Sequence, residues 1–218
     1  MDNPTTTRSS VLRNSIILGL FAMATVGMIA ITQQGTAERI SEAQRRVQLS
    51  ALNEILPHEQ HDNDLLADSF SVDDYPHLRL GAAHDAYRAK RDGKVVAVIL
   101  PVVAPEGYSG RIDLLVGIYA DGSVAGVRAA NHRETPGLGD KIETGKSQWI
   151  LEFKGKSLSM PVPENWAVKK DGGKFDQFTG ATITPRAVVK AVYQSLEYFA
   201  EHRRSLLQLP AEEPDNGN

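Results

Sequence analysis

An uncharged apolar stretch near the amino terminus is the first pattern in the sequence. Residues 15–32 contain no acidic or basic side chain. These eighteen residues, as a helix rising ~1.5 Å per residue, span about 27 Å, close to the ~30 Å hydrocarbon core of a bilayer. The apolar part of a signal peptide is shorter, about 7–15 residues, and no clear cleavage site precedes Gln33. The stretch therefore predicts an uncleaved transmembrane anchor.

Basic residues around the anchor bear on its orientation. Arg8 and Arg13 precede it, which favours an amino terminus in the cytoplasm. Arg39, Arg45 and Arg46 follow it and weaken that bias. Because the chain contains one such span, we expect the main domain to lie in the periplasm.

A helix is predicted to leave the membrane over residues 36–56, and Pro57 ends it because proline cannot continue a helix. Its apolar face is modest, which indicates limited packing against the domain that follows. The face consists of Ile40, Val47, Leu52 and Ile55.

Two histidines and two aspartates follow this helix. A metal site is conceivable from these side-chain types, but their spacing does not place the ligands together on one element. A solvated acidic loop is the favoured interpretation. The four residues are His58, His61, Asp62 and Asp64.

Short runs of Val and Ile separated by turn signals dominate the middle of the chain. Asp92-Gly93 and Asp121-Gly122 are typical of tight hairpins, and residues 105–110 read as a loop. Strands joined by tight turns form a largely antiparallel sheet. The predicted strands are 85–90, 94–103, 112–120 and 124–130.

The segment 131–139 breaks this pattern with two glycines and a proline. A strand-to-helix connection explains the glycines, which adopt unusual dihedral angles, but leaves Glu134 and Thr135 unexplained. A helix is expected over 140–153, and weak strands after Lys156. The apolar side of that helix consists of Ile142, Trp149, Ile150 and Phe153.

The last predicted helix, residues 187–202, starts after a cluster of small and hydroxylated residues. Thr184 suits the N-cap and Pro185 the first helical position. Such a helix start is either an ordinary cap or a seat for a phosphate, since its backbone N–H groups lack partners. Gly180 and Ala181 leave room there, and Thr182 adds a hydroxyl. The apolar face consists of Val188, Val192, Leu196 and Phe199.

Composition narrows the chemistry. The net charge of −3 argues against a nucleic-acid partner, because nucleic-acid binders carry strong basic patches. The chain has no cysteine, which excludes disulfides, protein-ligated iron–sulfur clusters, thiolate zinc sites and c-type haem. If electrons pass through the chain, an organic cofactor is the expected carrier.

These patterns together predict an α+β fold with an amino-terminal transmembrane helix and one domain built on a largely antiparallel sheet flanked by helices. The expected organisation places a cytoplasmic segment at 1–14, the anchor at 15–32, a membrane-proximal helix and connection at 33–80, the main domain at 81–206 and a disordered polar tail at 207–218.

Three stretches carry a resemblance to a known family. Asp176 to Thr182, Asp-Gln-Phe-Thr-Gly-Ala-Thr, resembles the flavinylation motif of the FMN-binding domain shared by the G subunit of the Rnf electron transport complex and the C subunit of the sodium-pumping NADH:quinone oxidoreductase. Glu134-Thr-Pro-Gly-Leu-Gly139 is similar to its second signature, and residues 107–124 to its strand pair. The chain looks closer to the Rnf G subunit. Thr179 stands where Ser or Ala often occurs.

The resemblance implies a covalent FMN, joined through its phosphate to the Thr182 hydroxyl by a separate flavin transferase. It implies an electron carrier in the bacterial inner membrane that exchanges electrons with other membrane subunits, without independent catalysis. Tyr108 is a candidate for stacking on the flavin, and His132 for tuning it. The implied cofactor-binding residues are Thr182, Thr179, Gly180, Ala181 and Thr184 beside the phosphate, with Glu134, Thr135, Gly137, Leu138 and Gly139 beside the flavin.

Three alternatives stay open. One is a component like the C subunit of the sodium pump, and another is an anchored periplasmic scaffold without a cofactor. The third is a flavin-dependent reductase that acts alone, although no Gly-x-Gly-x-x-Gly nicotinamide fingerprint follows a strand.

Overall fold

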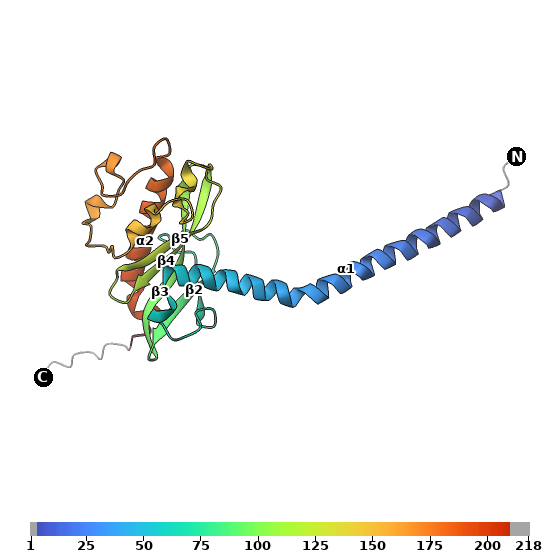
Figure 1. Ribbon diagram of the computed structural model, residues 1–218, viewed down its shortest axis with the longest axis horizontal. Coiled ribbons are helices and arrows are strands. Elements are labelled where there is room, and N and C mark those ends of the chain that lie inside the picture. The colour runs from blue at the N-terminus through green and yellow to red at the C-terminus, as the bar shows by residue number, and fades with distance from the viewer. Residues whose placement is uncertain (1–3, 210–218) are drawn as a thin grey trace. The chain divides into compact units, whose positions relative to one another are not determined.

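The computed structural model describes residues 4–209 (Figure 1). The chain divides into two units, Met1–Gln48 and Leu49–Asn218. Most of the predicted tail, residues 210–218, lies outside the described residues, as do residues 1–3. Leu207 is buried in the core of the second unit.

Helix α1 (Pro4–Ile55) joins the predicted anchor and the helix after it into one continuous element. Within it, Val11–Gln33 is long and apolar enough to cross a membrane, and this stretch includes the whole of the predicted anchor. The apolar face predicted further along was wrong in part. Leu52 and Ile55 are buried, whereas Ile40 and Val47 are exposed.

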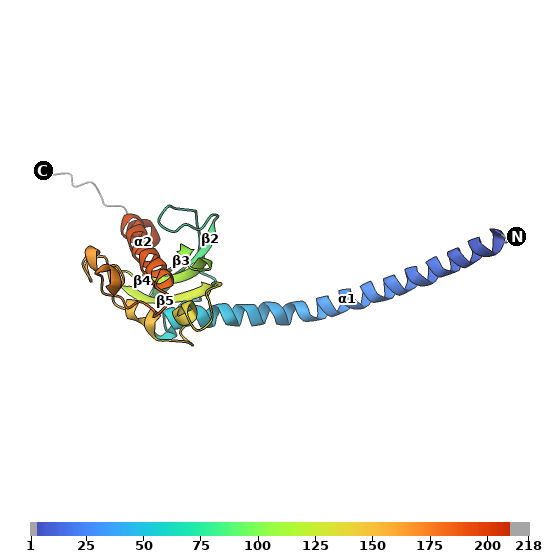
Figure 2. The ribbon, with the colours of Figure 1, turned by 90° about the horizontal axis from the view of Figure 1, so that it is seen from above.

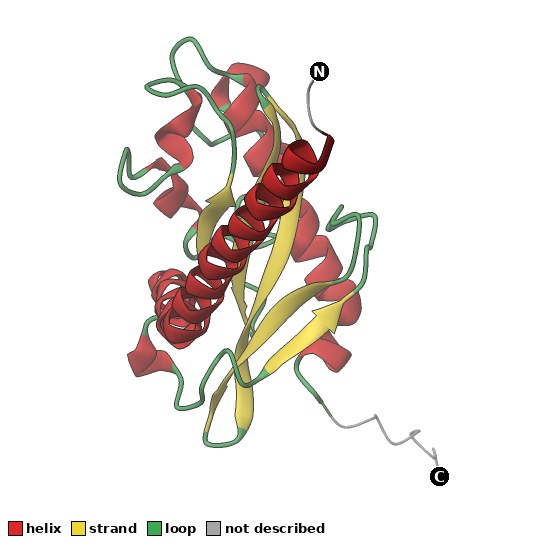
Figure 3. Cartoon of the chain, turned by 90° about the vertical axis from the view of Figure 1, so that its right-hand side faces the viewer, coloured by secondary structure: helices red, strands yellow, loops and turns green. Residues whose placement is uncertain are grey.

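Five strands form one antiparallel sheet in the order β1-β2-β3-β4-β5. The strands are drawn in yellow in Figure 3. Every strand pairs with its neighbour in the sequence. Tight turns join β2 to β3, β3 to β4 and β4 to β5, whereas the longer segment 73–83 joins β1 to β2. At the β2–β3 turn, Asp92 and Gly93 both have positive φ angles of 52° and 73°, as the predicted hairpin requires. The strands are β1 (Ser69–Val72), β2 (His84–Arg91), β3 (Lys94–Gly107), β4 (Gly110–Tyr119) and β5 (Val124–Asn131).

Two details of the sheet differ from the sequence prediction. The loop expected over 105–110 is a continuation of the hairpin: Gly107 pairs with Gly110, so only residues 108–109 form the turn. Strand β1 was missed, because its four residues contain only two apolar side chains, which alternate with serines. The first difference lengthens β3 and β4, and the second adds an edge strand to the sheet.

The sheet opens where β2 leaves β3. The β2–β3 pairing ends at Tyr87 with Ile99, although β3 continues for eight more residues to Gly107. The N–H of Val103 donates to Leu78 on this side of β3, so the residue two positions earlier, Pro101, would also have to donate here. Proline has no N–H, which explains why the ladder breaks at this point.

Helix α2 (Ile183–Leu206) covers one face of the sheet, and the end of α1 after Leu49 covers the other (Figure 2). The predicted apolar face of α2 is confirmed, because Val188, Val192, Leu196 and Phe199 are all buried. On the opposite face, Ile55 packs over two glycines, Gly117 and Gly126, which pair with each other across β4 and β5.

The segment between the sheet and α2 contains short 3-10 turns instead of the helix predicted over 140–153. Two turns, Gly139–Ile142 and Trp149–Phe153, are separated by a stretch containing Gly145, a poor helix former. The apolar positions were nevertheless correct, since all four are buried. The weak strands expected after Lys156 are only isolated bridges, Ser157 with Met160 and Val168 with Phe175.

Candidate functional site

A cavity of about 210 Å³ lies where the β3–β4 hairpin, the segment after β5 and the start of α2 meet. Eight residues from these three parts of the chain line it, and seven of them are residues that the sequence assigned to cofactor binding. The eighth, Tyr108, is the predicted stacking residue. The lining residues are Tyr108, Glu134, Thr135, Leu138, Gly139, Gly180, Ala181 and Thr184.

The start of α2 differs from the prediction in its capping residue. Thr182 occupies the N-cap position, and its side chain makes no capping hydrogen bond. Thr184 lies inside the first turn and its hydroxyl donates to Glu134, so it does not cap the helix. Pro185 is the third helical residue, where its missing N–H costs nothing because first-turn N–H groups have no intrahelical partner.

The loop before α2 is held by contacts on both sides of the motif. Phe178 is buried with its ring 5.0 Å from that of Trp149, and the indole N–H of Trp149 donates to the Asp176 carbonyl at 2.8 Å. The Asp176 carboxylate pairs with Lys169 at 2.5 Å, which raises the pKa of the Lys169 ammonium. Gly180 follows with φ of +80°, a conformation that favours glycine. The small residues beside the cavity are thereby fixed in place.

The second motif forms a tight turn against the cavity. The N–H groups of Leu138 and Gly139 donate to the Thr135 carbonyl at 3.1 and 3.0 Å. The turn therefore already uses the N–H of Gly139. Leu138 is 42% exposed and offers an apolar surface at the cavity edge.

His132 acts as a support for this turn. Its Nδ1 accepts the N–H of Glu134 at 3.2 Å, and its Nε2 lies 3.1 Å from a Glu143 carboxylate oxygen. With Nδ1 accepting, Nε2 carries the proton and donates to Glu143. The imidazole does not line the cavity, so these contacts support a structural role for it.

Glu134 connects the three walls of the cavity. It is only 5% exposed; Oε1 accepts the Ser109 N–H at 2.9 Å and Oε2 accepts the Thr184 hydroxyl. Sequence reasoning missed Ser109 and also Gly107, whose hydrogen atoms face Glu134 where a Cβ would lie 2.9 Å from Oε1. The two glycines of the Gly107-Tyr-Ser-Gly110 hairpin were the feature of the sequence that could have indicated these two residues.

Three predicted residues do not line the cavity. Thr182 is half-buried directly after Ala181 in the lining, Thr179 is exposed in the loop before it, and Gly137 is exposed at the turn with φ of +76°. Thr182 directly follows a lining residue in the sequence and occupies the N-cap of α2, a helix end that attracts anions.

The arrangement fits a flavin mononucleotide that is only partly enclosed. Enclosing sites for ligands of this size measure about 300–1,000 Å³, so a cavity of about 210 Å³ holds part of such a molecule and leaves the rest accessible. A phosphate at Thr182 would meet first-turn N–H groups, and Leu138 and Tyr108 provide apolar and aromatic contacts. Apart from Glu134, the lining contains no ionisable carboxylate.

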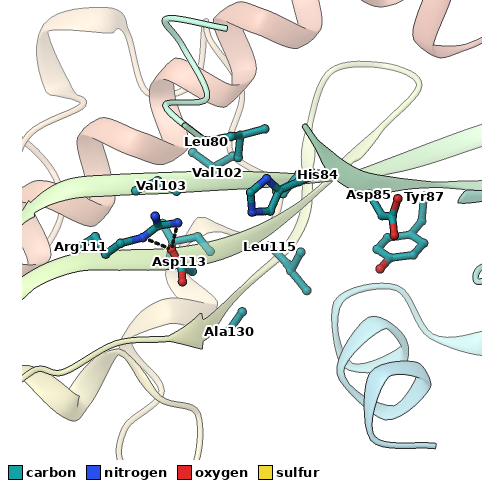
Figure 4. Close-up of a pocket in the computed structure, with 12 residues that line it drawn as sticks. Leu80, His84, Asp85, Tyr87, Val102, Val103, Arg111, Asp113, Leu115 and Ala130 are labelled. Carbon is teal, nitrogen blue, oxygen red and sulfur yellow. Dashed lines mark hydrogen bonds and ion pairs between the residues drawn. The ribbon is translucent and has the colours of Figure 1, made fainter. Parts of the chain in front are cut away.

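A second cavity, of about 290 Å³, lies where β2 leaves β3 (Figure 4). Its polar residues come from β2 and β4, including His84 and an ion pair of Arg111 with Asp113 at 2.7 Å. It contains none of the residues that the sequence assigned to cofactor binding. The break in the sheet at Pro101 accounts for this opening, and the smaller cavity remains the candidate site.

The acidic stretch after α1 is solvated as expected at His58, Asp62 and Asp64, which are exposed, and differs from the prediction at His61. His61 is 6% exposed, and its Nδ1 lies 3.0 Å from the Asn63 carbonyl, to which it donates. Across the described part of the chain, no group of three or more His, Cys, Asp or Glu side chains is placed to hold a metal ion.

Comparison with known proteins agrees with this geometry. Residues 107–197 match the FMN-binding domain family, and residues 1–55 match the RnfG N-terminal region. The FMN-binding match begins at the β3–β4 hairpin and includes every residue that lines the cavity.

Relatives match over nearly the whole chain. A protein of Pseudomonas aeruginosa strain UCBPP-PA14, named as the G subunit of an ion-translocating oxidoreductase complex, is 53% identical over 92% of this chain and 94% of its own length. Proteins of the same name from Shewanella loihica and Vibrio cholerae are 47% and 45% identical, over 94% and 93% of this chain and 96% of their own lengths. With its apolar amino-terminal helix, this chain is a membrane-anchored member of the family formed by the G subunits of ion-translocating oxidoreductase complexes.

Proposed function

We propose that this chain carries FMN, joined through its phosphate to the Thr182 hydroxyl, and passes electrons between other subunits of an ion-translocating oxidoreductase complex. The flavin, when bound, supplies the redox chemistry. The chain's own residues bind it, orient it and leave one edge accessible to partners.

The position of Thr182 is the observation that carries this proposal. It is the N-cap residue of α2, its side chain makes no capping hydrogen bond, and the cavity begins at the preceding residue, Ala181. First-turn N–H groups and the helix dipole favour an anion there. Gly180 and Ala181 keep side-chain bulk away from the approach.

A flavin transferase would form the linkage from FAD. The Thr182 oxygen bonds to the FMN phosphorus as the P–O–P bond of FAD breaks, AMP leaves, and the hydroxyl proton is lost. Because the flavin is never exchanged during electron transfer, a permanent bond prevents its loss without slowing turnover. The alternative without a cofactor predicts no such modification at Thr182. A reductase that acts alone would instead turn over its substrate as purified protein without partner subunits.

Mass analysis of the peptide that contains Thr182 tests the linkage. Protein produced together with a transferase should carry the added mass of FMN minus water on this peptide, and Thr182→Ala should lose it. Thr179→Ala is the matched control, because Thr179 is exposed and outside the cavity lining. An unmodified Thr182 in the presence of an active transferase would refute the proposal.

We also infer that the main domain lies in the periplasm, from the arginines before the anchor and the single span. The chain has no cysteine, so one introduced cysteine gives an unambiguous label. Lys154→Cys, at an exposed position, should react with a membrane-impermeant maleimide in cells with a permeabilised outer membrane. Labelling only after the inner membrane is lysed would place the domain in the cytoplasm.

A further inference from the structure

Glu134 is a buried carboxylate placed between three segments that surround the candidate flavin cavity. Its two oxygens accept one hydrogen bond from the tip of the β3–β4 hairpin, at Ser109, and one from the first turn of α2, at Thr184. It also lines the cavity. One side chain therefore links the hairpin, the second motif and the helix that carries Thr182.

The backbone around Glu134 is shaped to admit it. A Cβ at Gly107 would lie 2.9 Å from Oε1, and a Cβ at Gly139 would lie 2.6 Å from Oε2 and 2.9 Å from the Thr184 hydroxyl oxygen. Distances this short do not occur for real Cβ atoms. At Gly107 the hairpin itself also requires glycine, because a Cβ there would lie even closer to the Gly110 carbonyl oxygen. At Gly139 the Glu134 side chain is the nearest neighbour, with its Cβ also only 2.9 Å away, so this position needs glycine for the carboxylate to fit.

No positive charge compensates this carboxylate within the described residues, where none of the ion pairs includes Glu134. The neighbouring imidazole of His132 accepts the Glu134 N–H through Nδ1 and pairs with the Glu143 carboxylate through Nε2, so both of its nitrogens are already engaged. A carboxylate has about four acceptor positions, so two hydrogen bonds leave acceptor capacity unused on a side chain that lines the cavity. Burying a charge without a partner costs stability, which indicates a role beyond folding.

We infer that Glu134 is a positioning residue that holds the hairpin residue Tyr108 and the start of α2 around the flavin, and that its charge lowers the reduction potential of that flavin. The inference rests on the proposed function. Reduction adds electrons to the ring, and a nearby negative charge in a partly buried site opposes that addition. The carboxylate thereby favours the oxidised cofactor and makes the reduced one a stronger donor.

Potentiometric titration of the full-length, flavin-loaded protein in detergent tests the charge. Glu134→Gln keeps the size and one acceptor oxygen but removes the charge, and should raise the midpoint potential by at least ~30 mV, a tenfold change for a two-electron couple. Thr184→Val removes a hydrogen-bond donor from the carboxylate and should shift the potential downward. Opposite shifts indicate an electrostatic effect, because general loosening of the site would move both variants the same way.

Glu106→Gln is the matched control. Glu106 is a carboxylate on the same hairpin, but it is 64% exposed and paired with Lys190 at 3.3 Å, so solvent screens its charge. The flavin midpoint potential of the Glu106→Gln protein should equal that of the unsubstituted protein. If Glu134→Gln behaves like this control, or if Thr184→Val shifts the potential upward, the electrostatic role is wrong.

Amide hydrogen exchange on the protein before flavin attachment tests the positioning role without the cofactor. Glu134→Ala should speed exchange of the Ser109 amide at least tenfold, while amides in the middle of β4 are unchanged. Unchanged exchange at Ser109 would overturn the positioning role even if Glu134 variants fail to take up flavin. Absence of flavin from unsubstituted Thr182 would instead refute the proposed function, so the two failures are distinguishable.

Discussion

Substitution of Gly126 by alanine tests how the last turn of α1 sits on the sheet. Gly126 and Gly117 pair across β5 and β4, and Ile55 lies over both. A Cβ at Gly126 would lie 2.9 Å from the Ile55 carbonyl oxygen and 3.2 Å from its Cα. Because these are backbone atoms, no side-chain rotation relieves the contact, and the helix end must move off the sheet.

The cost follows from what that movement exposes. Leu52, Ile55 and Leu56 are each at most 1% exposed in this position. Burial of one such side chain is worth about 1.5–3 kcal/mol, and overpacking of a core costs about 1–3 kcal/mol. For Gly126→Ala we expect the free energy of unfolding to fall by about 2–3 kcal/mol. This value lies between the cost of partly exposing one large apolar side chain and the cost of exposing it fully.

Urea denaturation of the full chain in detergent measures this loss. Trp149 and Trp166 are both buried in the main core, so their fluorescence reports unfolding of the domain. With an m value of ~2 kcal/mol/M, the midpoint should fall by about 1–1.5 M. Gly145→Ala is the control, since no atom lies within 4 Å of a Cβ there, and it should change stability by less than about 0.5 kcal/mol.

Double substitutions with Ile55→Ala distinguish the effects of alanine at the two glycines. A Cβ at Gly117 would clash with the Ile55 side chain, so Ile55→Ala should relieve Gly117→Ala and make that pair less costly than the sum. The same change should not relieve Gly126→Ala, which meets backbone. If Gly126→Ala is as mild as Gly145→Ala, the helix end does not sit on the sheet as described.

Four further predictions concern the site and the domain. Gly139→Ala, whose Cβ would lie 2.6 Å from a Glu134 oxygen, should reduce flavin incorporation at least tenfold, read as flavin fluorescence on denaturing gels. Asn63 hydrogen-bonds Asp68 at 2.6 Å, the Arg88 carbonyl at 2.8 Å and the Lys90 N–H at 2.7 Å, so Asn63→Ala should cost about 2–3 kcal/mol in urea denaturation. Hydrogen bonds from Lys90 and Asn63 lower the pKa of Asp68. The stabilisation of the fold by the ionised Asp68 is therefore present above about pH 4 and is lost as pH falls through the lowered pKa. Asp68→Asn should flatten this acid dependence of the urea midpoint. Burial raises the pKa of Tyr198 from 10.0 to about 12, so its contribution is present below pH 10 and lost as pH rises toward 12, which tyrosinate absorbance should report together with unfolding.

The sheet could be predicted because its signals are local. Alternation of apolar residues and two Asp-Gly turns fixed the strands from Asp85 to Ala130, and each strand pairs with its neighbour. The helix predicted over 140–153 was wrong because its buried positions are equally compatible with two 3-10 turns around Gly145. Apolar spacing reports which side chains are buried more reliably than it reports the backbone that carries them.

The site residues were predicted in type, whereas their contacts were not. Thr184 is a residue type that is typical of an N-cap. Its hydroxyl instead donates a hydrogen bond to Glu134, fifty residues away in the sequence. The N–H of Gly139 donates to the Thr135 carbonyl within the turn, a contact that the glycine pattern alone does not show. A local pattern shows that a hydroxyl or N–H is present; only the folded chain shows which partner has already taken it.

The strand order has a consequence for the biogenesis of this protein. A meander in which successive hairpins associate can assemble progressively as the polypeptide emerges, since each step closes only a short loop. The face that α2 covers stays open until residues 183–206 have been synthesised. Under the proposed function, flavin attachment at Thr182 would therefore wait until α2 has formed, and products truncated before it would escape modification without any dedicated quality control.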